Sequence, residues 1–272
     1  MMRFDSNQAW KDAASAVSAN RDVLLALAGV FFVLPSFAFT LLYPQPEPPA
    51  GAEPEQLFEL MGAFYRQAWP VLLAIAAVQM VGTLAMLTLF TDRSRPTVGQ
   101  ALAQGVNGLV PVIAAQLILG MGLGLVALVP LAAAGATGIP AAVALVIVLA
   151  GAVMLWAYIR AALVSPAVVV DGIRNPVAAL RRSFALTKGN AGRIALFFLL
   201  LVVAFVIVVG VVSALLGMVF ETMIGGETAT ALTALVSSAG EAVMAVYFVA
   251  VVAATHRQLA GPSADVTAAR FE

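Results

Sequence analysis

Residues 192–219 of the chain read GRIALFFLLLVVAFVIVVGVVSALLGMV. After Arg193 this stretch contains no charged residue. A helix needs about 20 mostly apolar residues to cross the ~30 Å hydrocarbon core of a membrane. The stretch is long enough for that, so it predicts a membrane-spanning helix and makes helices the expected building blocks of the fold.

Five other stretches have the same apolar character, and they flank this one on both sides. The segment at 43–66 is rich in Pro and Glu, and we predict that it forms a loop between the first two spans; the fourth span ends before Pro166. We predict an all-α, polytopic membrane helix bundle within residues 1–260, followed by a short polar tail at 261–272. The six predicted spans are 23–42, 68–90, 108–131, 139–164, 192–219 and 229–255.

The composition supports a membrane protein. Of the 272 residues, 62% are hydrophobic and 10% are charged, against roughly a quarter charged in an ordinary soluble domain. The mean hydropathy is +1.01. These values exclude a disordered or fibrous protein and leave no room for a sizeable soluble domain.

The basic residues are distributed unevenly between the two ends of the predicted spans. With the amino terminus in the cytoplasm, 13 of the 14 Lys and Arg residues fall on the cytoplasmic side, and Arg66 alone falls outside. This matches the excess of Lys and Arg in cytoplasmic loops. It predicts a multi-pass protein with both termini inside, and we expect its location to be a bacterial cytoplasmic (inner) membrane. The formal net charge of the chain is zero, and it then divides into +6 on the cytoplasmic side, −5 on the outer side and −1 for Glu241 within the membrane.

The first span has an alternative interpretation as a signal peptide. Ser36 and Ala38 are small enough for a cleavage site. The 22 preceding residues are long for such a peptide and include Asp5, Asp12 and Asp22. We therefore expect the first span to be retained.

Each odd-numbered span follows a short stretch of helical character, at 9–20, 97–107 and 177–190. These stretches end at Asn20, Asn107 and Asn190, and Asn is a preferred helix N-cap. We predict three tandem units, each an interfacial helix with its apolar side in the acyl boundary followed by two spans. The alternative is coincidence, since Asn is common at helix starts.

The most distinctive stretch lies between the fourth and fifth spans. Residues 160–193 read RAALVSPAVVVDGIRNPVAALRRSFALTKGNAGR. This stretch, with Ser165-Pro166, Asp171, Pro176 and the run 179–189, resembles the membrane domain of bacterial glycerophosphoryl diester phosphodiesterases. That domain also occurs in stand-alone bacterial membrane proteins of unassigned function, with a similar six-span layout.

The resemblance implies a connection with lipid or the cell envelope, but no catalytic residue. In the full-length enzymes, hydrolysis belongs to a separate soluble barrel with histidine and carboxylate residues around a metal. This chain has no such domain, no cysteine and a single histidine, His256. We therefore predict no catalytic residue, no cofactor and no metal site.

Glu241 is the outstanding polar residue of the predicted spans. It lies about twelve residues into the sixth span, ~18 Å along the helix and thus near mid-bilayer. A carboxylate at that depth is a functional-site hypothesis by default. Together with Thr233 and Ser237 it forms a polar stripe that could line a cavity or hold a proton. The alternative is a protonated carboxyl that hydrogen-bonds Ser237, Ser238 or a neighbouring helix.

Two glutamines extend this candidate intramembrane site. Gln79 lies in the second span, and Gln116 shares a helix face with Gly120 and Gly124 in the third. Amides bond between helices, and small residues four apart let backbones approach, so packing is the competing role. Residues 120–124 are GMGLG, but no strand precedes them, so nucleotide binding is not expected.

A cluster of basic residues lies between the fourth and fifth spans. Such a cluster attracts anionic lipid head groups, although every inner loop of this type also needs positive charge for topology. No soluble basic surface remains for nucleic acid. The candidate contacts to anionic membrane lipids are Arg174, Arg181, Arg182, Lys188 and Arg193.

Together these features favour a non-enzymatic membrane protein that binds, organises or moves a lipid-like amphiphile. One alternative is a small-solute or proton-coupled transporter centred on Glu241. Another is a scaffold subunit of a larger membrane complex.

Overall fold

The computed structural model describes residues 3–46, 48, 49, 51–91 and 96–261, and these residues form helices and contain no strand. Six helices or helix pairs are long and apolar enough to cross a membrane, which confirms the six predicted spans. The first span combines α2 (Arg21–Ala28), the π-helical turn η1 (Gly29–Val33) and α3 (Leu34–Leu42). The fourth combines α6 (Pro140–Ala161) and α7 (Val164–Val169). The remaining helices are α1 (Ser6–Ala19), α4 (Pro54–Thr91), α5 (Val98–Ala136), α8 (Pro176–Thr187), α9 (Ala191–Met223) and α10 (Gly226–Ala260).

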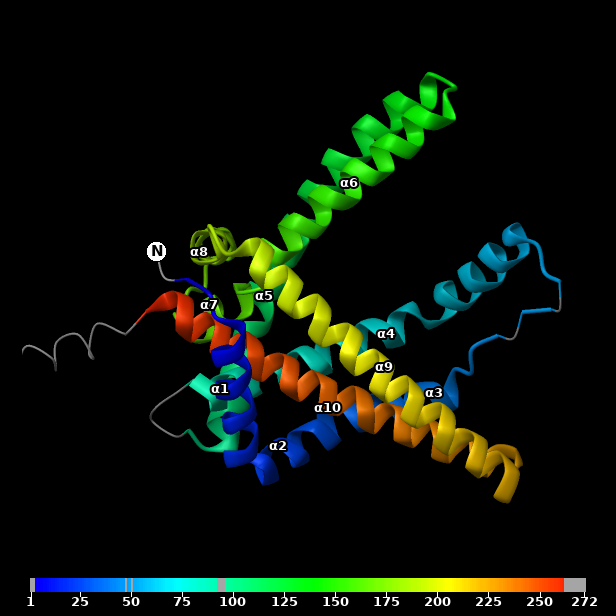
Figure 1. Cartoon of the computed structure of the whole chain (residues 1–272), viewed down its shortest axis with the longest axis horizontal. Helices are drawn as coiled ribbons and strands as arrows, with labels where there is room; N and C mark the ends of the chain where they lie inside the picture. The colour runs from blue at the N-terminus through cyan, green and yellow to red at the C-terminus, as the bar shows by residue number, and fades with distance from the viewer. Residues whose placement is uncertain (1–2, 47, 50, 92–95, 262–272) are drawn as a thin grey trace, which may run out of the picture.

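The spans are joined in three consecutive pairs, which we call hairpins: α2–η1–α3 with α4, α5 with α6, and α9 with α10. From a common base, the α5–α6 hairpin, the α9–α10 hairpin and the loop-end half of α4 point in different directions, and α3 lies beside α10 (Figure 1). The start of α1 and the end of α10 lie together at the base, which we call the terminal end. The described residues of the connections within the hairpins, at 43–46, 48–49, 51–53, 137–139 and 224–225, lie at the opposite, loop end.

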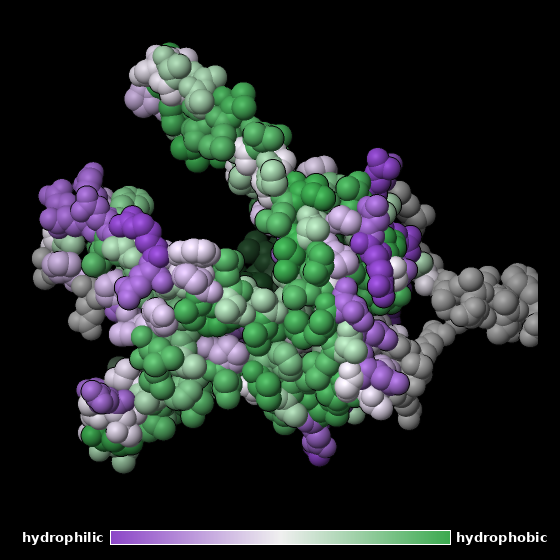
Figure 2. Space-filling view, turned by 180° about the vertical axis from the view of Figure 1, so that it is seen from behind, coloured by the Kyte–Doolittle hydropathy of each residue, from purple (hydrophilic) through white to green (hydrophobic). Residues whose placement is uncertain are grey.

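The hydrophobic core lies at the terminal end. Leu84 and Leu87 of α4, Ile194 of α9 and Val251 of α10 are almost fully buried there. The arms of the hairpins are exposed, and in α6 the buried residue is Ala157, close to its terminal end. In the view of Figure 2, hydrophobic side chains cover most of the middle of the molecule, and polar ones gather at arm tips and at the terminal end. This pattern places an apolar belt between two polar ends.

The second span is longer than predicted. Helix α4 begins at Pro54, so most of the segment predicted as a loop at 43–66 is helical. Proline is well suited to a first helical turn because its missing N–H has no partner there and its φ is preset. Glu55 in that turn also complements the positive helix terminus. The predicted loop was therefore wrong from Pro54 onward.

The fourth span contains a break before Pro166 and continues past this proline to Val169. α6 ends at Ala161, and α7 starts at Val164 with Pro166 as its third residue. A proline in a first turn removes no intrahelical hydrogen bond. The break instead lies at Ala162 and Leu163, and Ser183 of α8 accepts the Leu163 backbone N–H at 3.1 Å.

The three predicted units differ in their short helices. α1 and α8 are separate helices, but residues 98–107 form the first turns of a continuous α5. The prediction of a helix start at Asn107 was therefore wrong. Thr97 starts α5 instead, with a capping box in which Thr97 and Gln100 satisfy each other's backbone N–H groups.

Asn20 and Asn190 do occupy the breaks before α2 and α9, but neither caps the helix with its side chain. Asn20 Nδ2 donates to Ala16 O at the end of α1. Asn190 Oδ1 accepts the Phe4 backbone N–H at 2.9 Å. Asn20 therefore closes the last turn of α1, and Asn190 binds the N-terminal segment. Neither has the predicted capping role.

The short helices pack against protein as well as facing outward. α1 lies along α10, with Ala9 and Ala13 fully buried and Trp10 stacked on Tyr247 at 5.6 Å between ring centroids. In α8, Phe184 meets the Trp156 ring of α6 edge-on. Part of the apolar surface of each short helix therefore packs against protein, while Trp10 and Val177 stay exposed. The position of these helices in the acyl boundary stays a prediction.

Candidate functional site

A cavity of about 530 Å³ lies between the first and third hairpins. Five of its lining residues are polar, and the others are apolar or glycine. The lining combines η1, α3 and α4 of the first hairpin with α9 and α10 of the third: Phe32, Ser36, Gln79, Val206, Val209, Gly210, Ser213, Ser237, Glu241, Met244 and Ala245.

The π-helical turn shapes one wall of this cavity. Pro35 has no N–H to donate to the carbonyl four residues earlier, and a proline ring crowds that carbonyl in a regular α-helix. A wider turn relieves the crowding, and η1 supplies it immediately before Pro35, with the Leu34 backbone N–H donating to Gly29 O. Phe32 and Ser36, one turn apart, both line the cavity.

Two glycines bring the surrounding helices close together. A Cβ on Gly82 of α4 would lie 2.6 Å from Cβ of Phe31. A Cβ on Gly240 of α10 would lie 2.6 Å from Cγ1 of Val209. These contacts are shorter than any side chain permits, so glycine is required at both positions. Gly82 lies one turn beyond Gln79, and Gly240 directly precedes Glu241, so the close approaches border the cavity.

The polar groups of the cavity are only partly satisfied by one another. Gln79 Nε2 donates to Ser36 Oγ at 3.2 Å. Ser213 Oγ is buried and has no hydrogen-bond partner. Glu241 is exposed, and across the described residues it makes no ion pair or hydrogen bond, including with Ser237 or Ser238. The cavity thus offers an acceptor carboxylate and a free hydroxyl within a mainly apolar wall.

The cavity brings together three of the five predicted intramembrane residues: Gln79, Ser237 and Glu241. Thr233 lies elsewhere, because its Oγ1 donates to Ala229 O and its methyl group packs against Gly217 of α9. Gln116 lines a different cavity of about 350 Å³, with Tyr158 and Ser165 among its neighbours. The predicted polar stripe on α10 therefore reaches the cavity only at its inner end.

The proposed packing role of the glycines near Gln116 was wrong. A Cβ on Gly120 or Gly124 would have no atom within 4 Å, because the second hairpin is loosely packed in this part of its arm. The close approach of α5 to α4 occurs instead at Gly105, where a Cβ would lie 2.8 Å from Val81 O.

Sequence reasoning missed two hydroxyls of the cavity, Ser36 and Ser213. Ser213 carried a usable signal, because it is the single polar side chain between Ile194 and Phe220. Ser36 had been considered only as part of a cleavage site. Its position in the cavity follows from the π-helical turn, which changes the helix face that residues after it present.

Four of the five basic residues proposed as lipid contacts, Arg174, Arg181, Lys188 and Arg193, are exposed at the terminal end. Arg182 is used differently, since its Nε lies 2.8 Å from Oδ2 of Asp171. Among the other basic residues of the predicted inner side, Arg93, Arg95 and Arg270 lie outside the described residues, as does most of the predicted tail.

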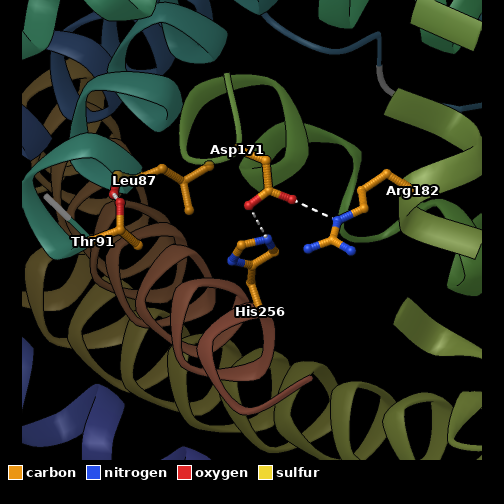
Figure 3. A network of polar contacts seen from close by, with 5 residues as sticks. All are labelled: Leu87, Thr91, Asp171, Arg182 and His256. Atoms are coloured by element: carbon orange, nitrogen blue, oxygen red, sulfur yellow. Dashed lines mark hydrogen bonds and ion pairs between the residues drawn. The ribbon is translucent and has the colours of Figure 1, made fainter. Parts of the chain in front are cut away.

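Asp171 connects the α7–α8 segment to α10 as well as to α8 (Figure 3). Its Oδ1 lies 3.2 Å from Nε2 of His256, a residue that is 2% exposed. Burial alone would raise the pKa of Asp171, but the contacts with His256 and Arg182 outweigh it and lower that pKa below its ordinary value. The ionised carboxylate therefore holds three segments together. Sequence reasoning assigned no role to His256.

Arg160 and Ser183, which also belong to the distinctive 160–193 stretch, form a second set of contacts. Ser183 Oγ donates to Arg160 O at 2.7 Å, and the Arg160 guanidinium lies over the rings of Trp156 and Phe184 at 5.4 and 5.2 Å. Cation–π contacts of this kind fix an arginine side chain. These contacts attach α8 to the end of α6.

The described part of the chain holds no group of three His, Cys, Asp or Glu residues that could bind a metal ion. No curated protein and no solved structure matches the chain. A family described as a domain of unknown function (DUF7847) matches residues 6–259. That match spans all six membrane-crossing segments, the cavity and the Asp171 network. The chain therefore belongs to the DUF7847 family.

Proposed function

We propose that this protein is a non-enzymatic integral protein of a bacterial inner membrane that binds a lipid-like amphiphile in the cavity around Glu241. The observation that carries the proposal is the meeting of Gln79, Ser213, Ser237 and Glu241 inside a mainly apolar cavity between two helix hairpins.

The unsatisfied polar groups indicate what the cavity can bind. A buried hydroxyl without a partner costs free energy that a ligand or water can recover. Ser213 Oγ has no partner, and Glu241 carries only acceptor oxygens when ionised. The best-fitting ligand therefore pairs hydrogen-bond donors, such as hydroxyl or amine groups, with an apolar body. An amphiphile has both parts.

The shape and charge of the molecule support the same function. Because the hairpins diverge (Figure 1), an amphiphile could enter sideways from the membrane. The exposed basic residues at the terminal end suit anionic lipid head groups. The resemblance of residues 160–193 to the membrane domain of glycerophosphoryl diester phosphodiesterases also favours a lipid ligand.

Native mass spectrometry of the protein purified in mild detergent tests the proposal. We expect the wild type to retain an amphiphile, and Gln79→Leu to lower its retention about threefold, the factor expected for one hydrogen bond within a membrane. Gln116→Leu is the matched control, because it removes the same amide from a membrane helix outside this cavity. A wild type that retains no amphiphile, or equal loss in the two variants, would contradict the proposal.

The second candidate function is proton-coupled transport of a small solute through the same cavity. The absence of an ion pair at Glu241 among the described residues favours it, because a carboxylate that no cation holds inside a membrane is by default a candidate member of a proton pathway. In proteoliposomes, Glu241→Gln should abolish uptake driven by a pH gradient, while Glu227→Gln at the loop end should leave it intact. Uptake that survives Glu241→Gln would exclude this mechanism.

A further inference from the structure

A second cavity, of about 280 Å³, lies at the terminal end between the first turns of α5 and the segment that joins α7 to α8. Its polar lining consists of Gln104 and Asn107 from α5 and Arg174 from the connecting segment. It shares no residue with the cavity around Glu241. Binding here therefore does not depend on the function proposed above.

Two glycines form this cavity. A Cβ on Gly108 would lie 3.3 Å from Leu84 and 3.4 Å from Val169, so α5 packs closely against α4 and α7 beside the cavity. Gly172 has a φ of +68°, a left-handed conformation that other residues adopt only with strain. This turn brings the chain back toward α5 and places Arg174 at the cavity.

The three polar side chains are free to bind a ligand. Arg174, Gln104 and Asn107 are exposed, and none makes a side-chain hydrogen bond or an ion pair with another described residue. This contrasts with Arg182, which Asp171 holds at 2.8 Å. A guanidinium and two amides together present several N–H donors to the same space.

Among the described residues, no carboxylate lines the cavity to neutralise Arg174. The acidic residue nearest to Arg174 along the sequence is Asp171, and Figure 3 shows its two oxygens directed at Arg182 and His256. The described lining of the cavity therefore carries a positive charge. An anion that accepts several hydrogen bonds fits it best.

We propose that this cavity binds a phosphate group, as a free phosphate or as the head group of a phospholipid. The Arg174 guanidinium matches two phosphate oxygens at once, and the amide groups of Gln104 and Asn107 donate to the others. Asn107 directly precedes the apolar stretch predicted to enter the membrane at 108, which puts the cavity at the depth of lipid head groups. Either source of phosphate uses the same three side chains.

The experiment uses two pairs of compounds on the full-length protein in detergent micelles, each pair consisting of a phosphate-containing probe and a control without phosphate. The first pair is phosphatidylglycerol and the diacylglycerol with the same acyl chains, measured by native mass spectrometry. The second pair is inorganic phosphate and chloride at equal ionic strength, measured by the thermal unfolding midpoint. The variants are Arg174→Gln and Asn107→Leu, both at exposed positions without side-chain partners. Arg66→Gln is the control, because Arg66 is an exposed arginine of α4 that neither lines the cavity nor belongs to the basic residues proposed as lipid contacts.

We expect phosphatidylglycerol, but not diacylglycerol, to bind, with affinity about tenfold lower in Arg174→Gln and about threefold lower in Asn107→Leu. Arg66→Gln should bind as the wild type does. Saturable stabilisation by inorganic phosphate that disappears in Arg174→Gln would identify free phosphate as a ligand and would also support the site. Equal weakening in Arg174→Gln and Arg66→Gln, or a wild type that binds neither phosphate probe, would overturn it.

Discussion

Asp171 joins two helices at the terminal end, because its carboxylate contacts both Arg182 of α8 and His256 of α10. Asp171→Asn keeps the shape and removes the charge. We expect it to lower the free energy of unfolding by about 2 kcal/mol at neutral pH, as for a hydrogen-bonded charge, measured by denaturant titration in micelles. Asp22→Asn should cause no measurable loss, since the Arg21–Asp22 pair is exposed.

The pH dependence of this contribution has a definite sign. Because folding lowers the pKa of Asp171, its stabilisation is fully present above the ordinary aspartate pKa of about 3.9. It is lost as the pH falls from there through the lowered pKa of the folded state. Asp171→Asn should remove this part of the acid-induced loss, and an unchanged difference between wild type and variant down to low pH would contradict the assignment.

At the residue scale, the sequence indicated which polar residues matter but not which residues they contact. The importance of Glu241, which lines the larger cavity, could be anticipated from its place in an apolar span, because a carboxylate within such a run is rare and conspicuous. Asp171 and Arg182 stood out within the 160–193 stretch. His256 lies 85 positions beyond Asp171 on another helix, and no spacing rule connects residues across such a distance. Their contact required the packed structure.

Close helix packing in this protein depends on individual glycines, and α5 offers a matched test. Gly105→Ala would place a Cβ 2.8 Å from Val81 O, an atom that cannot move without shifting α4. We expect a loss of about 1–3 kcal/mol, as for overpacked cores. Gly122→Ala lies on the same helix with nothing within 4 Å, and should be neutral or slightly stabilising because Ala favours helix over Gly. Thermal unfolding of the two variants in detergent measures the difference, and equal midpoints would contradict the predicted close approach.

At the element scale, hydropathy predicted the apolar centre of every span but not where each helix begins and ends. Apolar runs report where lipid or protein surrounds a helix, whereas α4 and α5 continue as helices beyond them. The π-helical turn before Pro35 and the break at Ala162 also left no hydropathy signal, because both are formed by apolar residues. The lining of the cavity around Glu241 depends on the first of these features, which is why Ser36 escaped notice.

The orientation of the whole molecule can be tested directly because the chain contains no cysteine. Single cysteines at Ser15, Glu55 and Thr228 would occupy exposed positions, the first at the terminal end and the others at the loop end. We expect a membrane-impermeant maleimide added to intact cells to label the Glu55→Cys and Thr228→Cys variants and not Ser15→Cys. Labelling of Ser15→Cys alone would reverse the orientation that the basic residues predict.

At the scale of the whole molecule, the sequence predicted six spans and gave no indication that the hairpins diverge. Divergence depends on contacts between hairpins, and the buried residues of α4, α9 and α10 that make them are concentrated toward the terminal end. Alanine, valine and leucine occur at both buried and exposed positions of these helices, because lipid accepts the same side chains that a core does. Composition therefore could not separate the packed base from the exposed arms.

The lengths of α4 and α5 have a consequence for the membrane around them. These helices contain 38 and 39 residues, so each measures about 57–59 Å at 1.5 Å per residue, nearly twice the ~30 Å hydrocarbon thickness. An over-long helix fits a bilayer by tilting, and tilt increases the spread of hairpins that are joined at one end. We therefore expect the separation of the arms to depend on bilayer thickness, with a thinner membrane favouring a wider entrance to the space between them.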